Sequence, residues 1–461
     1  FDKFVVLTQE DCGYWGALVI VAFTMMAAYY VNDVVAPLKT MLETDLAWSS
    51  TDFGFFTGGY SFLNVFFLML IWGGLILDRF GIRFTGKLAT ILMVGGTALE
   101  YYAMTGLAGA DATLFGINEI FGYKTGVFVA FAGYSIFGVG AEVAGITVSK
   151  IIAKWFKGKE LATAMGVQVA LARIGSQAGY AVAIPLARAF GISTPVLLGL
   201  VLLLGGMIAF FVFAVMDKKL DKQMEAAAIA AGTEDEEEKF SFKDVKNILV
   251  NPGFWLIALL CVLFYSCVFP FQKFASELMI IKYGINENVA GTFAGLPALG
   301  ALILTPVFGG FIDKRGKSAS IMLLGSAMLI CVHFIYAIPD INYWLVAIVL
   351  MIILGIAFSL VPSAMWPAVA KIFPVSQLGT AYALIFFIQN IGLWGIPTLI
   401  GWVLDAYCIS GKKPDGTNMY DYTVPMCIFT GIACLSLIVA LLLKKADKKY
   451  GYKLEEPNIQ K

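Results

Sequence analysis

Stretches of about 20 predominantly apolar residues recur along the whole chain, and they constrain the fold more than any other feature. Apolar residues make up 59% of the 461 residues and charged residues only 14%. Soluble domains are roughly half apolar and a quarter charged. A secretory signal would give only one short apolar run after a basic start. We therefore expect an integral membrane protein that crosses the bilayer many times.

A window of about 19 residues predicts twelve transmembrane helices and an all-α membrane protein, which we expect to be a monomer. Most Lys and Arg residues fall in the loops on one side, so the positive-inside rule places both termini in the cytoplasm. The predicted helices lie near residues 15–38, 52–77, 84–106, 125–153, 162–189, 194–216, 252–281, 289–312, 318–338, 342–371, 378–404 and 424–443.

The second half of the chain repeats the first. The pattern Gly74-x-x-x-Asp78-Arg79-x-Gly81 recurs as Gly309-x-x-x-Asp313-Lys314-x-Gly316, each time after the second predicted helix of its half. Parallel repeats of six helices predict two halves related by pseudo-two-fold symmetry about the membrane normal. The predicted parts are a six-helix half at 1–216, a cytoplasmic linker at 217–250 with an acidic run at 234–238, a second half at 251–443 and a cytoplasmic tail at 444–461.

The repeated pattern and its continuation to Arg83 resemble the cytoplasmic signature of the major facilitator superfamily. The resemblance implies the major facilitator fold and transport by alternating access. We expect Gly74 to permit close helix approach. The resemblance also implies an ion cluster that latches the halves together in one state, and its expected members are Asp78, Arg79, Arg83 and Asp313.

Several strings resemble a narrower group within this superfamily, the lysosomal dipeptide transporters and their bacterial relatives. They are AEV at 141–143, WFKGKEL at 155–161, ARIGS at 172–176, AMWPAVA at 364–370, QLGTAYA at 377–383 and FIQNIGL at 387–393. The resemblance implies transport of small peptides and places Glu142 and Arg173 in the dipeptide site. The resemblance also implies that the protein is located in the bacterial inner membrane or, in a eukaryotic cell, in the lysosomal membrane. Animal members depend on a glycosylated companion, but this chain has no N-x-S/T sequon, which favours a bacterial-type protein without that partner.

Glu142 and Arg173 stand near the middle of two predicted helices. A charged side chain at the bilayer centre costs about 2.5–3.5 kcal/mol, so each needs a partner or a water-filled cavity. A carboxylate and a guanidinium in one cavity suit a zwitterion: Arg173 would bind the C-terminal carboxylate bidentately, and Glu142 the α-ammonium. The alternative is a structural salt bridge between these two side chains.

The repeat predicts what faces this pair. It places Ser359 opposite Glu142 and Asn390 opposite Arg173, so the second half would supply neutral donors and acceptors. A neutral, aromatic surface in the second half would tolerate varied substrate side chains, and its predicted members are Trp366, Tyr382, Gln389 and Asn390. The first helix adds the candidates Tyr29, Tyr30 and Asn32.

A second charged group lies nearer the outer side. We expect Asp33, on the first helix, and Lys273, on the seventh, to touch when an outer gate closes. The alternative is a local pair between Lys273 and Glu277, which are spaced i, i+4 on one helix.

Several function classes are poorly supported. The chain contains one His, no Walker A motif and a net charge of zero, so we expect no enzyme, no ATP-driven pump, no metal or other cofactor and no nucleic-acid partner. The expected function is secondary transport of dipeptides or similar zwitterions, as uniport or linked to protons through Glu142. The alternatives are a small organic-anion transporter or exchanger and, outside transport, a membrane receptor or scaffold.

Overall fold

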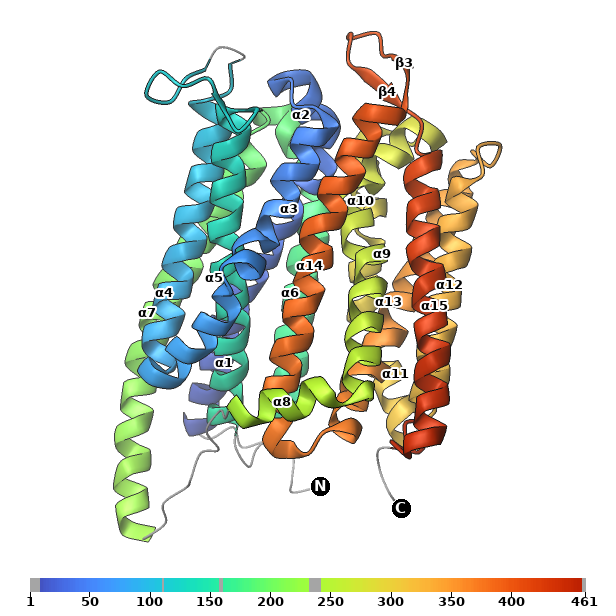
Figure 1. Ribbon diagram of the computed structural model, residues 1–461. Helices are drawn as coiled ribbons and strands as arrows, with labels where there is room; N and C mark the ends of the chain where they lie inside the picture. The colour runs from blue at the N-terminus through green and yellow to red at the C-terminus, as the bar shows by residue number, and fades with distance from the viewer. Residues whose placement is uncertain (1–8, 110–111, 157–160, 232–241, 458–461) are drawn as a thin grey trace, which may run out of the picture.

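The computed structural model describes residues 9–109, 112–156, 161–231 and 242–457 (Figure 1). Long helices run up and down beside one another, and apolar side chains fill the space between them. The first half contains α1 (Gln9–Val34), the 3-10 helix η1 (Ala36–Leu38), α2 (Lys39–Leu46), α3 (Ser50–Phe66), α4 (Met69–Thr105), β1 (Glu119–Ile120), β2 (Tyr123–Lys124), α5 (Thr125–Trp155), α6 (Leu161–Phe190) and α7 (Thr194–Ala231).

The second half follows a similar order. It contains α9 (Pro252–Tyr283), α10 (Glu287–Ala294), α11 (Leu296–Arg315), α12 (Ser318–Ala337), α13 (Trp344–Ile372), α14 (Val375–Tyr407), β3 (Ile409–Lys412), β4 (Asn418–Tyr420) and α15 (Thr423–Tyr450), and α8 (Phe242–Val250) precedes it. The two small hairpins, β1–β2 and β3–β4, are antiparallel and lie at one end of the bundle, which we call the hairpin end. The start of α1, the end of α15 and α8 lie at the opposite end, which we call the terminus end.

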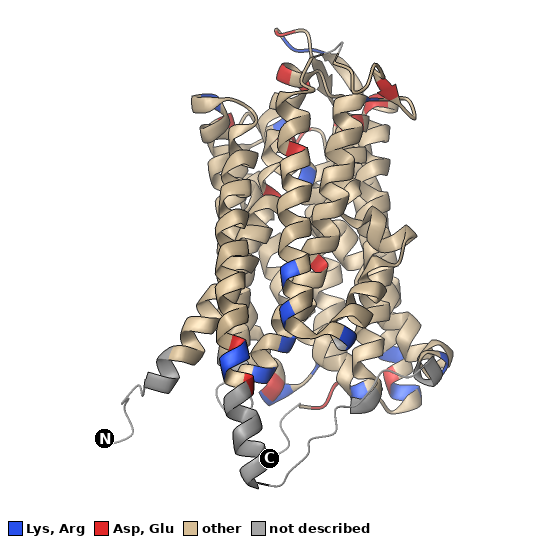
Figure 2. Ribbon diagram, turned by 90° about the vertical axis from the view of Figure 1, so that its left-hand side faces the viewer, with Lys and Arg blue, Asp and Glu red and all other residues tan. Residues whose placement is uncertain are grey.

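The predicted multi-span membrane protein is confirmed. Among the described residues, nine helical stretches are long and apolar enough to cross a membrane, and the bent pair of α3 and the start of α4 gives a tenth. The part of α4 after Gly81, and α6, run alongside these (Figure 1). Charged residues gather at the two ends of the bundle, with few along its middle (Figure 2). The count of twelve stays a prediction.

The predicted helix at 52–77 is not continuous. Ser49 and Asp52 form a capping box that starts α3, but the chain bends by 60° between α3 and the first turns of α4. Leu68, at this bend, adopts a left-handed backbone with φ of 53°. The predicted break between 77 and 84 is present, because Gly81 interrupts α4 with non-helical dihedral angles.

The repeated glycine pattern has a physical basis, but not the one expected for Gly74. The later glycine of each copy adopts positive φ, 76° at Gly81 and 70° at Gly316, which glycine alone adopts at little cost. A Cβ added at Gly74 would meet nothing within 4 Å, so the prediction of close approach there is wrong. Its neighbour Gly73, turned by about 100° on the helix, faces α5, where an added Cβ would lie 2.5 Å from Val143.

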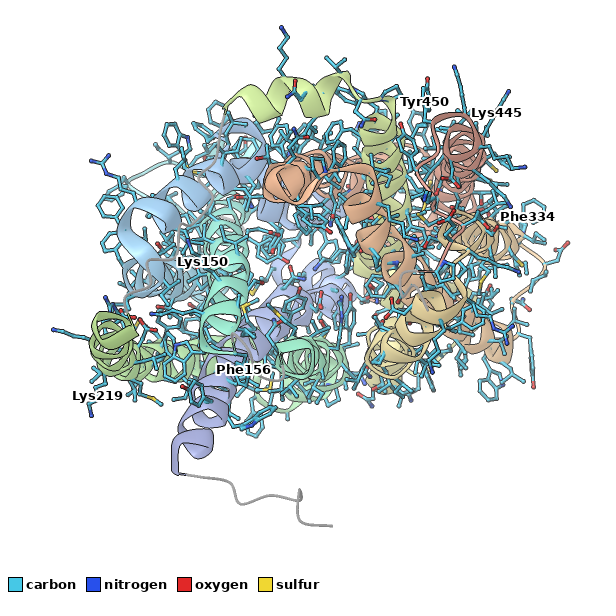
Figure 3. All side chains as sticks on the ribbon, turned by 90° about the horizontal axis from the view of Figure 1, so that it is seen from below. Lys150, Phe156, Lys219, Phe334, Lys445 and Tyr450 are labelled. Carbon is cyan, nitrogen blue, oxygen red and sulfur yellow. The ribbon has the colours of Figure 1, made fainter. Side chains whose placement is uncertain are left out.

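The segment between the halves is helical on both sides. α7 continues as one helix to Ala231, and α8 is a short helix that contains Val245 and Ile248. The acidic run at 234–238 lies outside the described residues. α8 packs against α9 and α14 and lies across the terminus end (Figures 1 and 3). The predicted domain boundaries stay predictions.

The halves meet mainly along two contacts: α3 packs against α14, and α6 packs against α10 and α11. Gly54 and Gly58 allow the first crossing, since a Cβ would lie 2.4 Å from the Pro397 carbonyl or 2.7 Å from the Trp394 carbonyl. Gly291 allows the second, because a Cβ there would lie 2.2 Å from the Tyr180 carbonyl oxygen. These contacts lie in the part of the helices nearer the hairpin end, so the two halves are joined there.

Candidate functional site

A cavity of about 190 Å³ lies between the halves, with walls from α1, α3, α5, α9 and α14. The first half lines it with the polar side chains of Tyr29, Asn32, Thr57, Tyr60, Tyr134 and Glu142, and the second half with Lys273, Gln389 and Asn390. A water-sized group needs ~10–15 Å³ of such space, so the cavity holds on the order of fifteen such groups. It can enclose a small polar solute but not a long chain.

Glu142 occupies the predicted place in this cavity. Its side chain is half-buried on α5, and the hydroxyl of Tyr60 on α3 donates to its Oε1 at 2.9 Å. α3 and α5 come together at Gly138, one turn before Glu142, where an added Cβ would lie 2.0 Å from the Tyr60 carbonyl oxygen. The close crossing thus places the phenol against one carboxylate oxygen. Within the described residues, Glu142 makes no ion pair.

Arg173 is half-buried on α6 and lies beside the cavity, outside the residues that form its wall. The guanidinium stacks 5.6 Å from the ring of Tyr29 in the first half and 4.9 Å from the ring of Phe358 in the second. Among the described residues it makes no hydrogen bond or ion pair, so the alternative of a salt bridge with Glu142 is not formed here. Arg173 therefore has its N–H donors available, held between two aromatic rings that leave the guanidinium edge open.

The aromatic residues predicted to form the wall of the second half gather around Trp366, but Trp366 and Tyr382 do not line the cavity. Its ring stacks on Phe386 at 4.9 Å, its Nε1 donates to the hydroxyl of Tyr265 at 3.3 Å, and its carbonyl accepts from the hydroxyl of Tyr382 at 2.9 Å. Phe386 reaches the cavity itself, while Trp366 and Tyr382 lie behind it. The aromatic rings therefore support the cavity wall more than they form it.

Gln389 and Asn390 line the cavity as predicted. Asn390 is almost completely buried, and its Nδ2 donates to the Phe386 carbonyl at 2.9 Å. Its Oδ1 has no hydrogen-bond partner among the described residues. A buried acceptor without a donor costs free energy, so this oxygen is a candidate contact for a bound N–H group.

Besides Arg173, Trp366 and Tyr382, two more predicted site residues do not reach the cavity. Ser359 is fully buried within α13, and its hydroxyl donates to the Gly355 carbonyl at 2.7 Å. Tyr30 points toward α7, where its hydroxyl donates to the Pro195 carbonyl at 3.2 Å. The repeat locates each position along its helix, but a helix rotates by about 100° per residue. Position alone therefore did not predict which way these side chains face.

The expected contact between Asp33 and Lys273 is present. Lys273 Nζ lies 3.5 Å from Asp33 Oδ1 and donates to the Asn32 carbonyl at 2.6 Å. Ser176 on α6 donates to the other carboxylate oxygen of Asp33 at 2.6 Å. The alternative pair of Lys273 with Glu277 is not formed, because Glu277 pairs with Lys39 at 2.5 Å. Lys273 thus joins the halves at the hairpin side of the cavity.

At the terminus end, Arg83 belongs to an ion cluster within the first half and not to the expected latch between the halves. Arg83 Nη1 lies 2.7 Å from Asp221 and 3.5 Å from Asp217, both on α7, and Lys154 on α5 contacts the same two carboxylates at 2.5 and 2.9 Å. The partners that Arg83 has here belong to its own half, so this cluster does not join the two halves in this structure.

Two of the other predicted latch residues, Arg79 and Asp313, have described side chains. Arg79 is exposed beside the ring of Phe80, Asp313 is half-buried at the end of α11, and the side chain of Asp78 lies outside the described residues. A latch that joins the halves therefore stays a prediction for another state of the protein.

Sequence reasoning missed several polar residues of the site. Tyr60, Thr57 and Tyr134 line the cavity, and each stands in an apolar helix where a polar side chain is unusual. Two of them lie beside the pair Gly58 and Gly59, which was the available signal. Lys39, near the hairpin end, was missed because its partner Glu277 is far away in the sequence.

Comparison with known proteins agrees with this architecture. The family model described as Major Facilitator Superfamily matches residues 18–397 and 274–456. The chain is 29% identical over 448 residues to the lysosomal dipeptide transporter MFSD1 of Homo sapiens. The aligned region covers 94% of this chain and 86% of that protein. It is 27% identical over 441 residues to the MFSD1 of Danio rerio, covering 93% and 86%.

A solved structure has a similar fold. The crystal structure of the peptide transporter POT in complex with sulfate superimposes with a TM-score of 0.68, covering 96% of each chain at 14% sequence identity. At this identity the likeness concerns the fold alone. The repeated halves, the cavity between them and the matching family model together identify this chain as a member of the Major Facilitator Superfamily.

Proposed function

We propose that this chain is a secondary transporter of dipeptides that works by alternating access. The observation that carries the proposal is the placement of Glu142 and Arg173: one acid and one guanidinium beside one cavity, not paired with each other. The relatives named lysosomal dipeptide transporter MFSD1 support the same substrate class.

The two charges would bind the two ends of a zwitterion. Arg173 offers a planar fork of N–H donors, which matches a carboxylate in a bidentate contact. Glu142 has one oxygen fixed by Tyr60, which leaves the other free to accept from an α-ammonium. The Oδ1 of Asn390, which has no partner among the described residues, would accept from the peptide N–H. These contacts require a solute with both a carboxylate and an ammonium end, but they do not select among its side chains.

The size of the cavity favours two residues. An extended dipeptide spans at most about 7 Å. It has roughly 9 backbone heavy atoms. Together with small side chains, these atoms match the cavity, which has room for on the order of fifteen water-sized groups. A longer peptide would extend beyond the walls. A free amino acid would fit but would fill less of the cavity.

We propose that both termini face the cytoplasm, in the bacterial inner membrane or, in a eukaryotic cell, the lysosomal membrane. The terminus end carries the basic loops with Arg79, Arg83, Lys154 and Arg315, as the positive-inside rule requires. The hairpin end is then the outer side, where the halves are in contact. The structure thus corresponds to a state closed on the outer side.

A small organic anion is the second candidate substrate, since Arg173 alone could bind its carboxylate. Uptake of a labelled dipeptide into proteoliposomes tests both. We expect unlabelled dipeptides to compete and dicarboxylates not to compete, and we expect flux to follow the dipeptide gradient, with a proton gradient changing only its rate. Competition by dicarboxylates alone would reject the dipeptide proposal. No uptake of either, with ligand binding intact, would favour a receptor or scaffold.

A further inference from the structure

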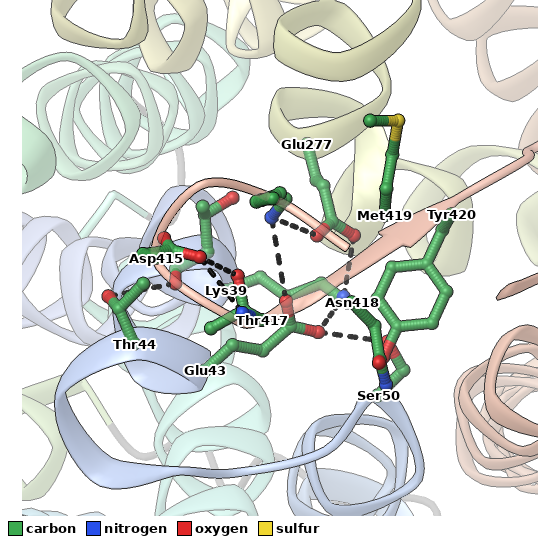
Figure 4. A network of polar contacts seen from close by, with 12 residues as sticks. Lys39, Glu43, Thr44, Ser50, Glu277, Asp415, Thr417, Asn418, Met419 and Tyr420 are labelled. Atoms are coloured by element: carbon green, nitrogen blue, oxygen red, sulfur yellow. Dashed lines mark hydrogen bonds and ion pairs between the residues drawn. The ribbon is translucent and has the colours of Figure 1, made fainter. Parts of the chain in front are cut away.

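Four charged side chains meet at the hairpin end, on the seam between the halves (Figure 4). Lys39 and Glu43 belong to α2, Glu277 to α9, and Lys413 to the turn of the β3–β4 hairpin. Lys39 Nζ lies 2.7 Å from Glu43 Oε1 and 2.5 Å from Glu277 Oε2. The side chains of Lys39 and Glu277 are 1% and 0% exposed. Those of Glu43 and Lys413 are 5% and 15% exposed. The cluster is therefore almost dry.

The charges of this cluster balance only when the hairpin is in place. Lys39 lies between two carboxylates but carries one positive charge. Lys413 supplies the second, at 3.8 Å from Glu43 Oε2 and 3.8 Å from Glu277 Oε1. A buried charge without a partner is costly, because it loses its hydration without compensation. Without Lys413, the closed seam would therefore carry one uncompensated negative charge.

Further contacts seat the same hairpin on the first half. The ring of Tyr420 on β4 lies 4.7 Å below Lys39 Nζ. Its hydroxyl donates to Asp405 Oδ1 at 2.7 Å, and Asp405 Oδ2 accepts from the backbone N–H of Thr51 at the start of α3 at 2.5 Å. The hairpin, which belongs to the second half, thus covers residues of α2 and α3 across the seam.

Lys413 is held less tightly than Lys39. Among the described residues its Nζ makes no hydrogen bond, and neither do the two carboxylate oxygens that face it. Lys39, in contrast, is within hydrogen-bond distance of both carboxylates. Contacts at 3.8 Å are ion pairs that can separate without breaking a hydrogen bond. Lys413 would therefore be the first of these contacts to leave.

We propose that the β3–β4 hairpin is a lid on the outer gate, and that Lys413 locks it by completing the charge of Lys39, Glu43 and Glu277. The lid closes when the halves meet at the hairpin end and lifts before they separate. The inference goes beyond the transported solute, because it concerns the closing of the outer side and would hold for any substrate.

The test measures access to the cavity from the outer side. Thr57, which lines the cavity, is replaced by Cys in a chain whose seven native cysteines are replaced by Ser or Ala, and a membrane-impermeant maleimide is added from outside. In Lys413→Gln the labelling rate should rise about tenfold, the factor that about 1.4 kcal/mol produces. The control Lys412→Gln should leave the rate unchanged, since Lys412 is exposed and its Nζ donates to Asn418 on the same hairpin.

Two more variants test the charge balance itself. Lys413→Arg should label as slowly as the parent chain, because it keeps the charge. Adding Glu277→Gln to Lys413→Gln removes the uncompensated carboxylate and should return labelling toward the slow rate. The proposal is overturned if Lys413→Gln labels no faster than Lys412→Gln, or if the double variant labels as fast as Lys413→Gln alone. No substrate is needed, so a failed dipeptide proposal would not affect the result.

Discussion

Replacing Arg173 by Ala should remove most of the affinity for dipeptides without unfolding the protein. The side chain makes no hydrogen bond or ion pair with any described residue, so its loss leaves no buried partner unsatisfied. It loses only the stacking on Tyr29 and Phe358, an interaction of about 0.5–2 kcal/mol. The unliganded protein should therefore remain folded.

The expected loss of affinity follows from the contact that Arg173 would make. A hydrogen bond to a charged group is worth about 1.5–3 kcal/mol, and every 1.4 kcal/mol is about tenfold in affinity. Arg173→Ala should then bind dipeptides roughly tenfold to hundredfold more weakly. At a dipeptide concentration of about 100 times the parent Kd, the ligand stabilises the parent by about 2.7 kcal/mol. A hundredfold loss reduces this to about 0.4 kcal/mol.

Thermal unfolding with and without dipeptide measures this difference. The control is Arg315→Ala, which removes an arginine that stacks on a ring, Phe311, far from the cavity at the terminus end. We expect a full ligand-induced shift of Tm in the control and little shift in Arg173→Ala. Arg173→Lys should recover only part of the shift, because a lysine cannot make the bidentate contact. An undiminished shift in Arg173→Ala would remove this residue from the site.

Three further outcomes are expected. Tyr60→Phe removes the hydroxyl that donates to Glu142. Dipeptide binding, measured by titration calorimetry, should weaken by roughly threefold to tenfold, the effect of about 0.5–1.5 kcal/mol. An unchanged Kd would contradict the positioning role of Tyr60. Gly138→Ala drives a Cβ against the Tyr60 carbonyl and should lower stability by about 1–3 kcal/mol, whereas Gly74→Ala, which meets open space, should not lower Tm. Glu100→Gln removes a fully buried carboxylate whose oxygens have no hydrogen-bond partner among the described residues. The Tm should therefore stay the same or rise. A marked fall in Tm would show that the charge has a partner.

The sequence was sufficient for the features that depend on one-dimensional patterns. Apolar runs predict the helices, the repeated glycine motif predicts the two halves, and an acid or a guanidinium in an apolar helix marks the cavity at Glu142 and beside Arg173. These inferences held because lipid leaves a charged side chain few places to lie.

The features that the sequence did not predict depend on rotation and on distant pairing. Ser359 and Tyr30 lie at the predicted positions along their helices, but their side chains face away from the cavity. Lys273 was expected to have either a distant or a local partner, and only the three-dimensional arrangement distinguishes Asp33 from Glu277. The pairing of Lys39 with Glu277 joins residues from the two halves of the chain, and no local spacing predicts it.

The crossing of α3 and α14 has a consequence for how the halves can move. At Gly54 and Gly401 the two helices touch backbone to backbone, so no side chain from either helix is inserted into the other at that point. Interlocked side chains would have to change rotamers before two helices could tilt past each other, whereas a smooth surface of glycine allows rocking with a low barrier. The crossing is therefore suited to separate and re-form as the outer side opens and closes, and bulky residues at Gly54 would hinder that closure even where they leave the cavity unchanged.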